Sequence, residues 1–263
     1  MAGPICRFRR LAMPYALGAL AAVAYGVPAL AQQVDPGVYS QLRARHIGPV
    51  GNRVASVAGI PGNDLVYFAG AASGGVWRTL DGGLNWDPVF DDQDAHAIGA
   101  LAVAPSDPNV VWAGTGEPHL RSNVSIGDGV YRSTDGGDSW QNMGLGRSGR
   151  ISAVVIHPQN ADVVFVAALG HAHGPQEERG IYRTTNGGDT WERVLFVDEN
   201  TGASSVVMDP NNPRILFAGM WQIEMNTWGR ESGGPGGGLH MSRDGGDNWT
   251  RLEGAGLPSL PIG

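Results

Sequence analysis

Three segments of the chain gather residue types that could bind a ligand or assist a reaction. The candidates are Glu117, His119 and Arg121 in the first; His171, His173, Glu177 and Arg179 in the second; and Trp221, Glu224, Trp228 and Arg230 in the third. Arginine binds carboxylates, and tryptophan offers a flat apolar surface to a sugar ring or a side chain. These types suit a saccharide or peptide ligand. The same segments could instead mainly cover neighbouring structure, and both interpretations stay open.

The same residues support a metal site, a cofactor site or a hydrolytic site less well than they support ligand binding. A zinc site needs three or four converging ligands, so His171-x-His173 beside Glu177 and Glu178 is better interpreted as polar loop residues; no metal or cofactor is expected. Hydrolysis of a glycosidic bond needs two carboxylates facing each other across the sugar, and the sequence cannot place Glu117, Glu177 or Glu224 in such a pair. All 18 basic residues are arginine, which excludes reactions that depend on a lysine.

A sequence repeat predicts the strands that must position these three segments. Four similar strings run over Arg78–Trp86, Arg132–Trp140, Arg183–Trp191 and Met241–Trp249. The steps from Asp81 to Asp135, Asn186 and Asp244 are 54, 51 and 58 residues. A period of this length is typical of solenoids, propellers and arrays.

Each repeat contains four strand-like runs. In the second repeat these runs are Ile98–Ala104, Val110–Gly114, Gly129–Ser133 and Ser139–Met143. Such a unit describes a propeller blade, and the sequence predicts an all-β propeller of about four blades, at residues 53–90, 97–144, 150–196 and 203–253. The candidate segments join second to third strands and are expected on one face. The repeated strings are expected on the other.

The residues of the repeated string suit a turn. Its aspartate can accept hydrogen bonds from amides of the same turn, its paired glycines allow unusual backbone conformations, and its tryptophan can fill the gap between blades. A structural role is therefore preferred over a catalytic one for the repeated residues, which are Asp81, Trp86, Asp135, Trp140, Asn186, Trp191, Asp244 and Trp249. These strings resemble the Asp-box, or BNR repeat, of sialidases, sortilins and xyloglucan-active glycosidases. Asn85 and Asn248 depart from its usual Ser or Thr.

The spacer segments carry a further resemblance. Gly114-Thr-Gly-Glu-Pro118, Glu178-Arg-Gly-Ile-Tyr182 and Val197-Asp-Glu-Asn-Thr-Gly202 resemble a group of exported bacterial sortilin-like (VPS10-like) BNR-repeat proteins, often labelled glycosyl hydrolases. The resemblance implies a propeller that binds a peptide, protein or glycan through the loops opposite the Asp-boxes. The alternative that it implies is a glycoside hydrolase whose site lies partly in further blades, and an assembly platform is a third.

Two departures weaken the enzymatic alternative. The xyloglucanase-like propellers carry an aspartate just before the Gly-Gly of the first blade's third strand, where this chain has Ala71-Ala-Ser73-Gly-Gly75. Sialidases carry a Phe/Tyr-Arg-Ile-Pro string, to which Ala44–Pro49 is the nearest approach without a match. Catalysis therefore has no recognisable residue set in the sequence.

The N-terminus predicts export. Basic residues, an apolar stretch over residues 11–30 and the small-x-small site Ala29-Leu-Ala31 are typical of a signal peptide covering residues 1–31, followed by an extension over residues 32–52. The net charge of −7 is unfavourable for nucleic acid, and no membrane insertion is expected after cleavage. Because the chain stops after the fourth blade, the sequence also suggests an incomplete propeller.

Overall fold

A computed structural model describes residues 37, 53–121, 124–171, 173–254 and 256–258. The chain divides into two compact units, Met1–Arg45 and His46–Gly263, and the strands all belong to the second. The expected signal peptide and nearly all of the 32–52 extension lie outside the described residues.

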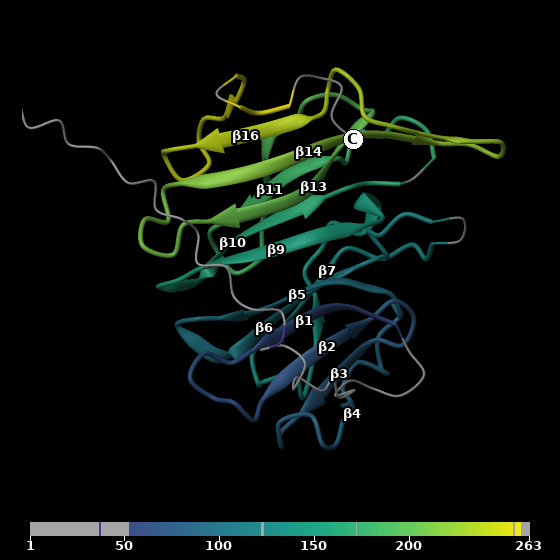
Figure 1. The fold of residues 1–263 in the computed structure, drawn as a ribbon. Helices are drawn as coiled ribbons and strands as arrows, with labels where there is room; N and C mark the ends of the chain where they lie inside the picture. The colour runs from purple at the N-terminus through teal and green to yellow at the C-terminus, as the bar shows by residue number, and fades with distance from the viewer. Residues whose placement is uncertain (1–36, 38–52, 122–123, 172, 255, 259–263) are drawn as a thin grey trace, which may run out of the picture. The chain divides into compact units, whose positions relative to one another are not determined.

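Four antiparallel sheets follow one another along the second unit (Figure 1). The first sheet contains β1 (Val54–Gly59), β2 (Tyr67–Ala71), β3 (Val76–Thr79) and β4 (Asp87–Pro88). The second contains β5 (Ile98–Ala104), β6 (Asp107–Thr115), β7 (Val130–Ser133) and β8 (Gln141–Asn142). The third contains β9 (Ile151–His157), β10 (Asn160–Ala168), β11 (Gly180–Thr184) and β12 (Glu192–Leu195). The fourth contains β13 (Thr201–Met208), β14 (Leu216–Met225), β16 (Gly238–Ser242) and β17 (Thr250–Arg251), with β15 (Arg230–Ser232) paired to β14.

This architecture confirms the all-β fold of four-stranded antiparallel blades. Within each sheet the strands pair in chain order, since antiparallel neighbours can be joined directly without a crossover connection. No α-helix occurs in the described part of the chain; a 3₁₀ turn lies at Gly146–Ser148. The strand over Ile98–Ala104 has the predicted bounds, whereas β6 begins at Asp107 because its turn from β5 is tighter than expected.

The four repeated strings form one kind of turn between the third and fourth strands. In the second sheet Asp135 Oδ1 accepts hydrogen bonds from the Ser133 hydroxyl at 2.7 Å and from the Ser139 amide at 2.9 Å. Gly136 and Gly137 have φ angles of 72° and 92°, which side chains with a Cβ rarely adopt. Asn186 makes the corresponding bonds to the Thr184 hydroxyl and the Thr190 amide in the third sheet. The turn thus depends on the side-chain oxygen and the paired glycines.

Arginines that begin these strings join each sheet to the next. Arg78 donates to Gly136 O and Asp138, both at 2.7 Å, and Arg183 donates to Gly245 O at 2.9 Å and Asp247 at 2.6 Å. Each of these guanidiniums therefore bonds to the turn of the following sheet.

Tryptophans of the repeated turns contact the preceding sheet in the middle of the chain. The Trp140 indole N–H donates to Val89 O, and that of Trp191 donates to Met143 O, both at 2.8 Å. The expected filling of the gap between sheets is seen directly for these two. The Trp86 and Trp249 indoles donate to Gly83 O and Gly246 O of their own turns, and Trp249 still packs against the core between the last two sheets.

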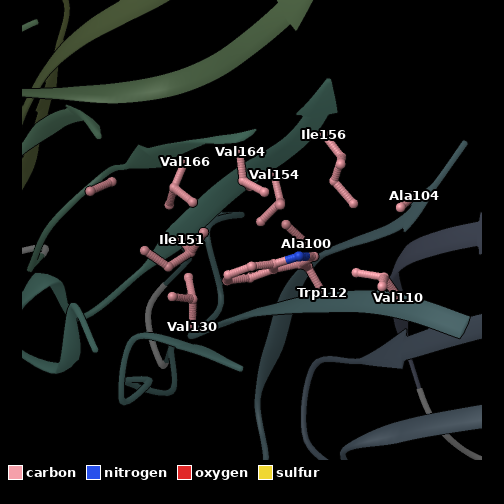
Figure 2. Close-up of a cluster of buried hydrophobic side chains, with 11 residues drawn as sticks. Ala100, Ala104, Val110, Trp112, Val130, Ile151, Val154, Ile156, Val164 and Val166 are labelled. Carbon is pink, nitrogen blue, oxygen red and sulfur yellow. The ribbon is translucent and has the colours of Figure 1, made fainter. Parts of the chain in front are cut away.

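The hydrophobic core lies between consecutive sheets rather than within one. Three clusters of buried side chains each combine residues of two neighbouring sheets. Figure 2 shows the middle cluster, in which Trp112 of β6 lies among aliphatic side chains such as Val154 and Val166 of the third sheet. Because burying apolar area stabilises a fold roughly in proportion to that area, the sheets depend on one another for stability.

The third sequence segment differs from expectation. The sequence predicts that this segment joins the second and third strands of its repeat as a loop, but β14 continues to Met225 and β15 pairs with it from Arg230 to Ser232. The resulting hairpin extends beyond the sheet as the olive-green arm in Figure 1. A short turn between two runs of extended residues satisfies backbone groups that an open loop of this length would leave to solvent.

Acid should weaken the repeated turns. Hydrogen bonds from the backbone of Asn85 lower the pKa of Asp81 to about 2, and the hydroxyl of Ser139 does the same for Asp135. Since both folded pKa values lie below the ordinary value of 3.8, these carboxylates stabilise the fold above about pH 4, and this contribution disappears as the pH falls toward 2. Asp135→Asn introduces the residue that the third repeat has at the equivalent position, Asn186. In this variant the urea concentration at the unfolding midpoint should fall less between about pH 4 and pH 2 than in the original protein. An unchanged loss in the variant would contradict this interpretation.

Candidate functional site

Loops and strand ends of three sheets meet in one groove of about 710 Å³. We call it the loop groove; its lining residues are Leu120, Arg121, His173, Met225, Asn226, Thr227, Gly229 and Arg230. Leu120 and Arg121 follow β6, His173 follows β10, and the others belong to the hairpin of β14 and β15. The structure therefore brings together members of all three segments that the sequence singled out.

The hairpin closes one side of the loop groove through two contacts. Arg230 Nη1 donates to Leu120 O at 3.0 Å, and the His173 ring lies with Nδ1 3.0 Å from Met225 O. Met225 pairs with Arg230 across the two strands. These contacts tie the fourth sheet to the loops of the second and third.

A buried carboxylate lies beside the loop groove. Glu117 is 1% exposed and forms ion pairs with Arg53, which directly precedes β1, and with Arg121, whose Nε lies 2.9 Å from Oε1. Arg150, which precedes β9, is also buried; desolvation lowers its pKa while the charge of Glu117 opposes that shift. Glu117 therefore orients guanidiniums and does not face a ligand itself.

Arg179 is likewise buried rather than presented to solvent. Its guanidinium donates to His171 O at 2.8 Å, Gly174 O at 3.2 Å and Asn200 O at 2.5 Å. Burial lowers the pKa of Arg179 from its usual range. The side chain holds the loop over residues 171–179 in place, which makes it a positioning residue.

A second pocket, of about 400 Å³, involves other residues of this loop. It is lined by Arg147, His171, Pro175, Gln176, Glu177 and Glu178. Arg147 forms an ion pair with Glu178 at 2.7 Å, and the Gln176 side chain donates to Arg147 O at 2.6 Å. His171 and Glu177 are thus separated from the loop groove that contains His173.

The remaining predicted residues lie at the edges of the site. His119 and Glu224 are exposed, and Trp221 is half-buried with its indole N–H donating to Ser232 Oγ at 3.0 Å. Trp228 is 87% exposed at the tip of the hairpin. No group of three or more His, Cys, Asp or Glu side chains within the described ranges is arranged to hold a metal ion.

Sequence reasoning missed Arg53, Arg147, Leu120 and Met225. An alignment of the repeats offers a signal for Arg53, since it precedes its first strand at the position that Arg150 holds in the third repeat. Leu120 and Met225 carry no such signal, because an apolar residue in a loop has no distinguishing chemistry. They join the site only through the path of the hairpin.

A family model described as "Sortilin, neurotensin receptor 3" matches residues 128–255. The chain is a sortilin-like propeller with BNR-type repeats. An ancestral GH74 enzyme of known structure is 22% identical with a TM-score of 0.60, covering 78% of this chain and 26% of that one. The sortilin-like propeller thus shares its fold with GH74 enzymes.

Sequence relatives of the sortilin-like propeller include proteins with different roles. A probable oligoxyloglucan-reducing end-specific xyloglucanase of Neosartorya fischeri is 26% identical over 61% of this chain and 18% of its own length. A photosystem II assembly lipoprotein, Ycf48, of Synechococcus sp. is 24% identical over 66% of this chain and 55% of its own length. The chain therefore spans only part of the relatives it matches.

Proposed function

We propose that this protein is an exported propeller that binds a peptide, protein or glycan ligand in the loop groove. The observation that carries the proposal is the convergence of segments from three sheets on one groove of about 710 Å³. Binding sites tend to lie on loops held by a rigid scaffold, and pockets of this volume accommodate small ligands or parts of larger ones. Arg121, His173 and Arg230 provide polar groups for specificity.

A groove-filling substitution tests this proposal. His173 is exposed and lines the loop groove, so His173→Trp should weaken binding of any ligand found on peptide and glycan arrays by tenfold or more. Gln159→Trp is the matched control, because Gln159 is exposed in the turn between β9 and β10. Binding that tolerates His173→Trp as well as Gln159→Trp would place the ligand elsewhere.

Export is part of the same proposal. No helix in the described part of the chain is long and apolar enough to cross a membrane. When the full chain is expressed with a bacterial secretion system, the exported protein should begin at Gln32, since the Ala29-Leu-Ala31 site precedes it. Mass spectrometry of the intact protein measures this directly. An unprocessed N-terminus starting at Met1 would contradict it.

A glycoside hydrolase is the second candidate function, favoured by the similarity to xyloglucanases. The carboxylates of the three segments occupy different surroundings: Glu117 is buried among arginines, Glu177 lines the second pocket and Glu224 lies on the hairpin. Incubation with xyloglucan and measurement of new reducing ends tests this activity. Release of sugar that Glu177→Gln or Glu224→Gln abolishes would support hydrolysis over binding alone.

A further inference from the structure

The loop groove is cationic although the chain as a whole is acidic. Its lining contains Arg121, Arg230 and His173, and no Asp or Glu is among the described residues that line it, whereas the net charge of the chain is −7. Glu224 and Glu231 of the hairpin lie opposite each other in the strand register, one position away from Met225 and Arg230. Successive residues of a strand point to opposite faces, so the two glutamates project away from the face that lines the groove.

Arg230 is held in an orientation that suits a carboxylate. Its Nη1 is fixed by the hydrogen bond to Leu120 O, while its Nε and Nη2 make no hydrogen bond to any residue that the structure describes. Two parallel N–H groups on one edge of a guanidinium match the two oxygens of a carboxylate. Because one nitrogen is already fixed, little side-chain freedom remains to be lost when an anion binds.

Arg121 is positioned in a similar way from the other side of the groove. Its Nε and Nη2 lie 2.9 and 3.4 Å from the two carboxylate oxygens of Glu117, a side chain that is 1% exposed. Glu117 therefore fixes the plane of this guanidinium. The Glu117 carboxylate forms ion pairs with two arginines, Arg53 and Arg121, and so it does not neutralise both of them. Arg230 adds a further positive charge to the groove.

An exposed indole lies in the turn of the same hairpin. Trp228 is 87% exposed, and its turn is fixed by hydrogen bonds from Asn226 N to Gly229 O at 2.9 Å and from Trp228 N to Asn226 Oδ1 at 3.2 Å. Trp228 lies in this turn two residues before Arg230, and it is not among the residues that line the loop groove. An exposed flat ring at this position can stack on the C–H face of a sugar unit that extends beyond the groove while Arg230 pairs with a carboxylate of the same polymer.

We infer that the loop groove takes an acidic polysaccharide, in which a uronate carboxylate pairs with Arg230 and a neighbouring sugar ring stacks on Trp228. The inference rests on the proposed function and names its ligand class. A sugar polymer is favoured over an acidic peptide because only Leu120 and Met225 supply large apolar groups to the groove, while Asn226 and Thr227 offer amide and hydroxyl groups to sugar hydroxyls. The net negative charge of the chain means that attraction must come from the groove itself.

De-esterified polygalacturonate is the probe for this inference, measured by titration calorimetry with the full chain. Carboxyl-reduced polygalacturonate is the neutral comparison, and galacturonic acid monomer tests whether a single carboxylate suffices. We expect the acidic polymer to bind, with affinity that falls as salt is raised. The reduced polymer and the monomer should each bind about tenfold more weakly or worse, because each lacks one of the two contacts.

Substitutions locate the binding. Arg230→Gln and Trp228→Ala should each weaken binding of polygalacturonate about tenfold, whereas Arg214→Gln, at an exposed arginine between β13 and β14, should leave it unchanged. Arg230 and Trp228 are both exposed, so the unfolding midpoint of each variant should change only slightly, even though Arg230→Gln loses the surface hydrogen bond to Leu120 O. Equal binding of the reduced polymer, or binding insensitive to Arg230→Gln, would overturn the inference.

The two proposals fail in different ways. If polygalacturonate does not bind, but a peptide or neutral glycan from the arrays binds and His173→Trp removes that binding, the acidic-polysaccharide inference is wrong and the groove remains the binding site. If array ligands bind independently of His173→Trp, the groove itself is wrong as the site.

Discussion

Replacing Trp112 with alanine should lower the free energy of unfolding by about 3–5 kcal/mol, the usual cost of truncating a fully buried tryptophan. Trp112 is 0% exposed and lies in the cluster that joins the second and third sheets. Its ring meets that of Trp191 edge-on, with centroids 5.9 Å apart, and the Arg132 guanidinium lies 5.8 Å from its centroid. The substitution removes contacts with both sheets at once.

The hydrogen-bonding state of Trp112 sharpens this prediction. Its Nε1 has no hydrogen-bond partner among the residues that the structure describes, so Trp112→Phe removes volume without breaking one of the described polar contacts and should cost less than alanine. Gly188 of the third sheet approaches the ring so closely that a Cβ there would lie 2.8 Å from it. The space around the ring is therefore filled by backbone, which cannot collapse easily into the cavity.

Urea unfolding followed by circular dichroism measures the effect, and Trp228→Ala is the matched control. Trp228 is the same residue type but 87% exposed, and its truncation should change the free energy of unfolding by no more than about 0.5 kcal/mol. Similar losses for the two variants would show that the packing between the second and third sheets does not determine stability.

The repeated turns could be predicted from sequence because their interactions are local. Asp135 bonds to residues two and four positions away, and the glycines beside it act through their own φ angles. All the relevant residue types therefore stand in one short string. Strand pairing follows from the same locality, since each strand pairs with its neighbour in the chain.

The site could be predicted only in part, because the sequence does not show whether a polar side chain is buried or exposed. Glu117 and Arg230 have equally suitable chemistry for a ligand, but Glu117 is buried in ion pairs with Arg53 and Arg121, whereas Arg230 is exposed. Arg53, 64 residues away in sequence, is one of these partners. The hairpin was missed for a related reason: Gly229 and Trp228 read as loop residues, and only the pairing of Met225 with Arg230 reveals the turn.

Arg179 decides how the second segment is positioned, and its loss should destabilise both the fold and the site. The guanidinium bonds to carbonyls of His171, Gly174 and Asn200, so it joins the loop after β10 to the residues that precede β13. Removing it takes the guanidinium donor from these partly buried carbonyl oxygens and empties a fully buried site, and a buried polar group left unpaired costs about 1–3 kcal/mol. Arg179→Leu should therefore lower the free energy of unfolding by about 3 kcal/mol or more.

Lysine cannot replace this arginine, although it keeps the charge. A guanidinium presents donors in a planar fork, whereas an ammonium is a compact charge at the end of a flexible chain. Arg179→Lys should fold but allow faster hydrogen exchange at residues 171–179, because the loop loses part of its attachment. Arg147→Lys is the control, since Arg147 is 89% exposed in its side chain and bonds at the surface.

Hydrogen exchange separates the positioning role from general stability. If Arg179 holds the loop, exchange in Arg179→Lys should rise first at residues 171–179 and less in β10 and β11, which keep their strand pairing. Uniform acceleration across the third sheet would show that the substitution only lowers global stability. Because His173 lines the loop groove, the positioning role also requires that Arg179→Lys weaken binding at that groove while Arg147→Lys does not.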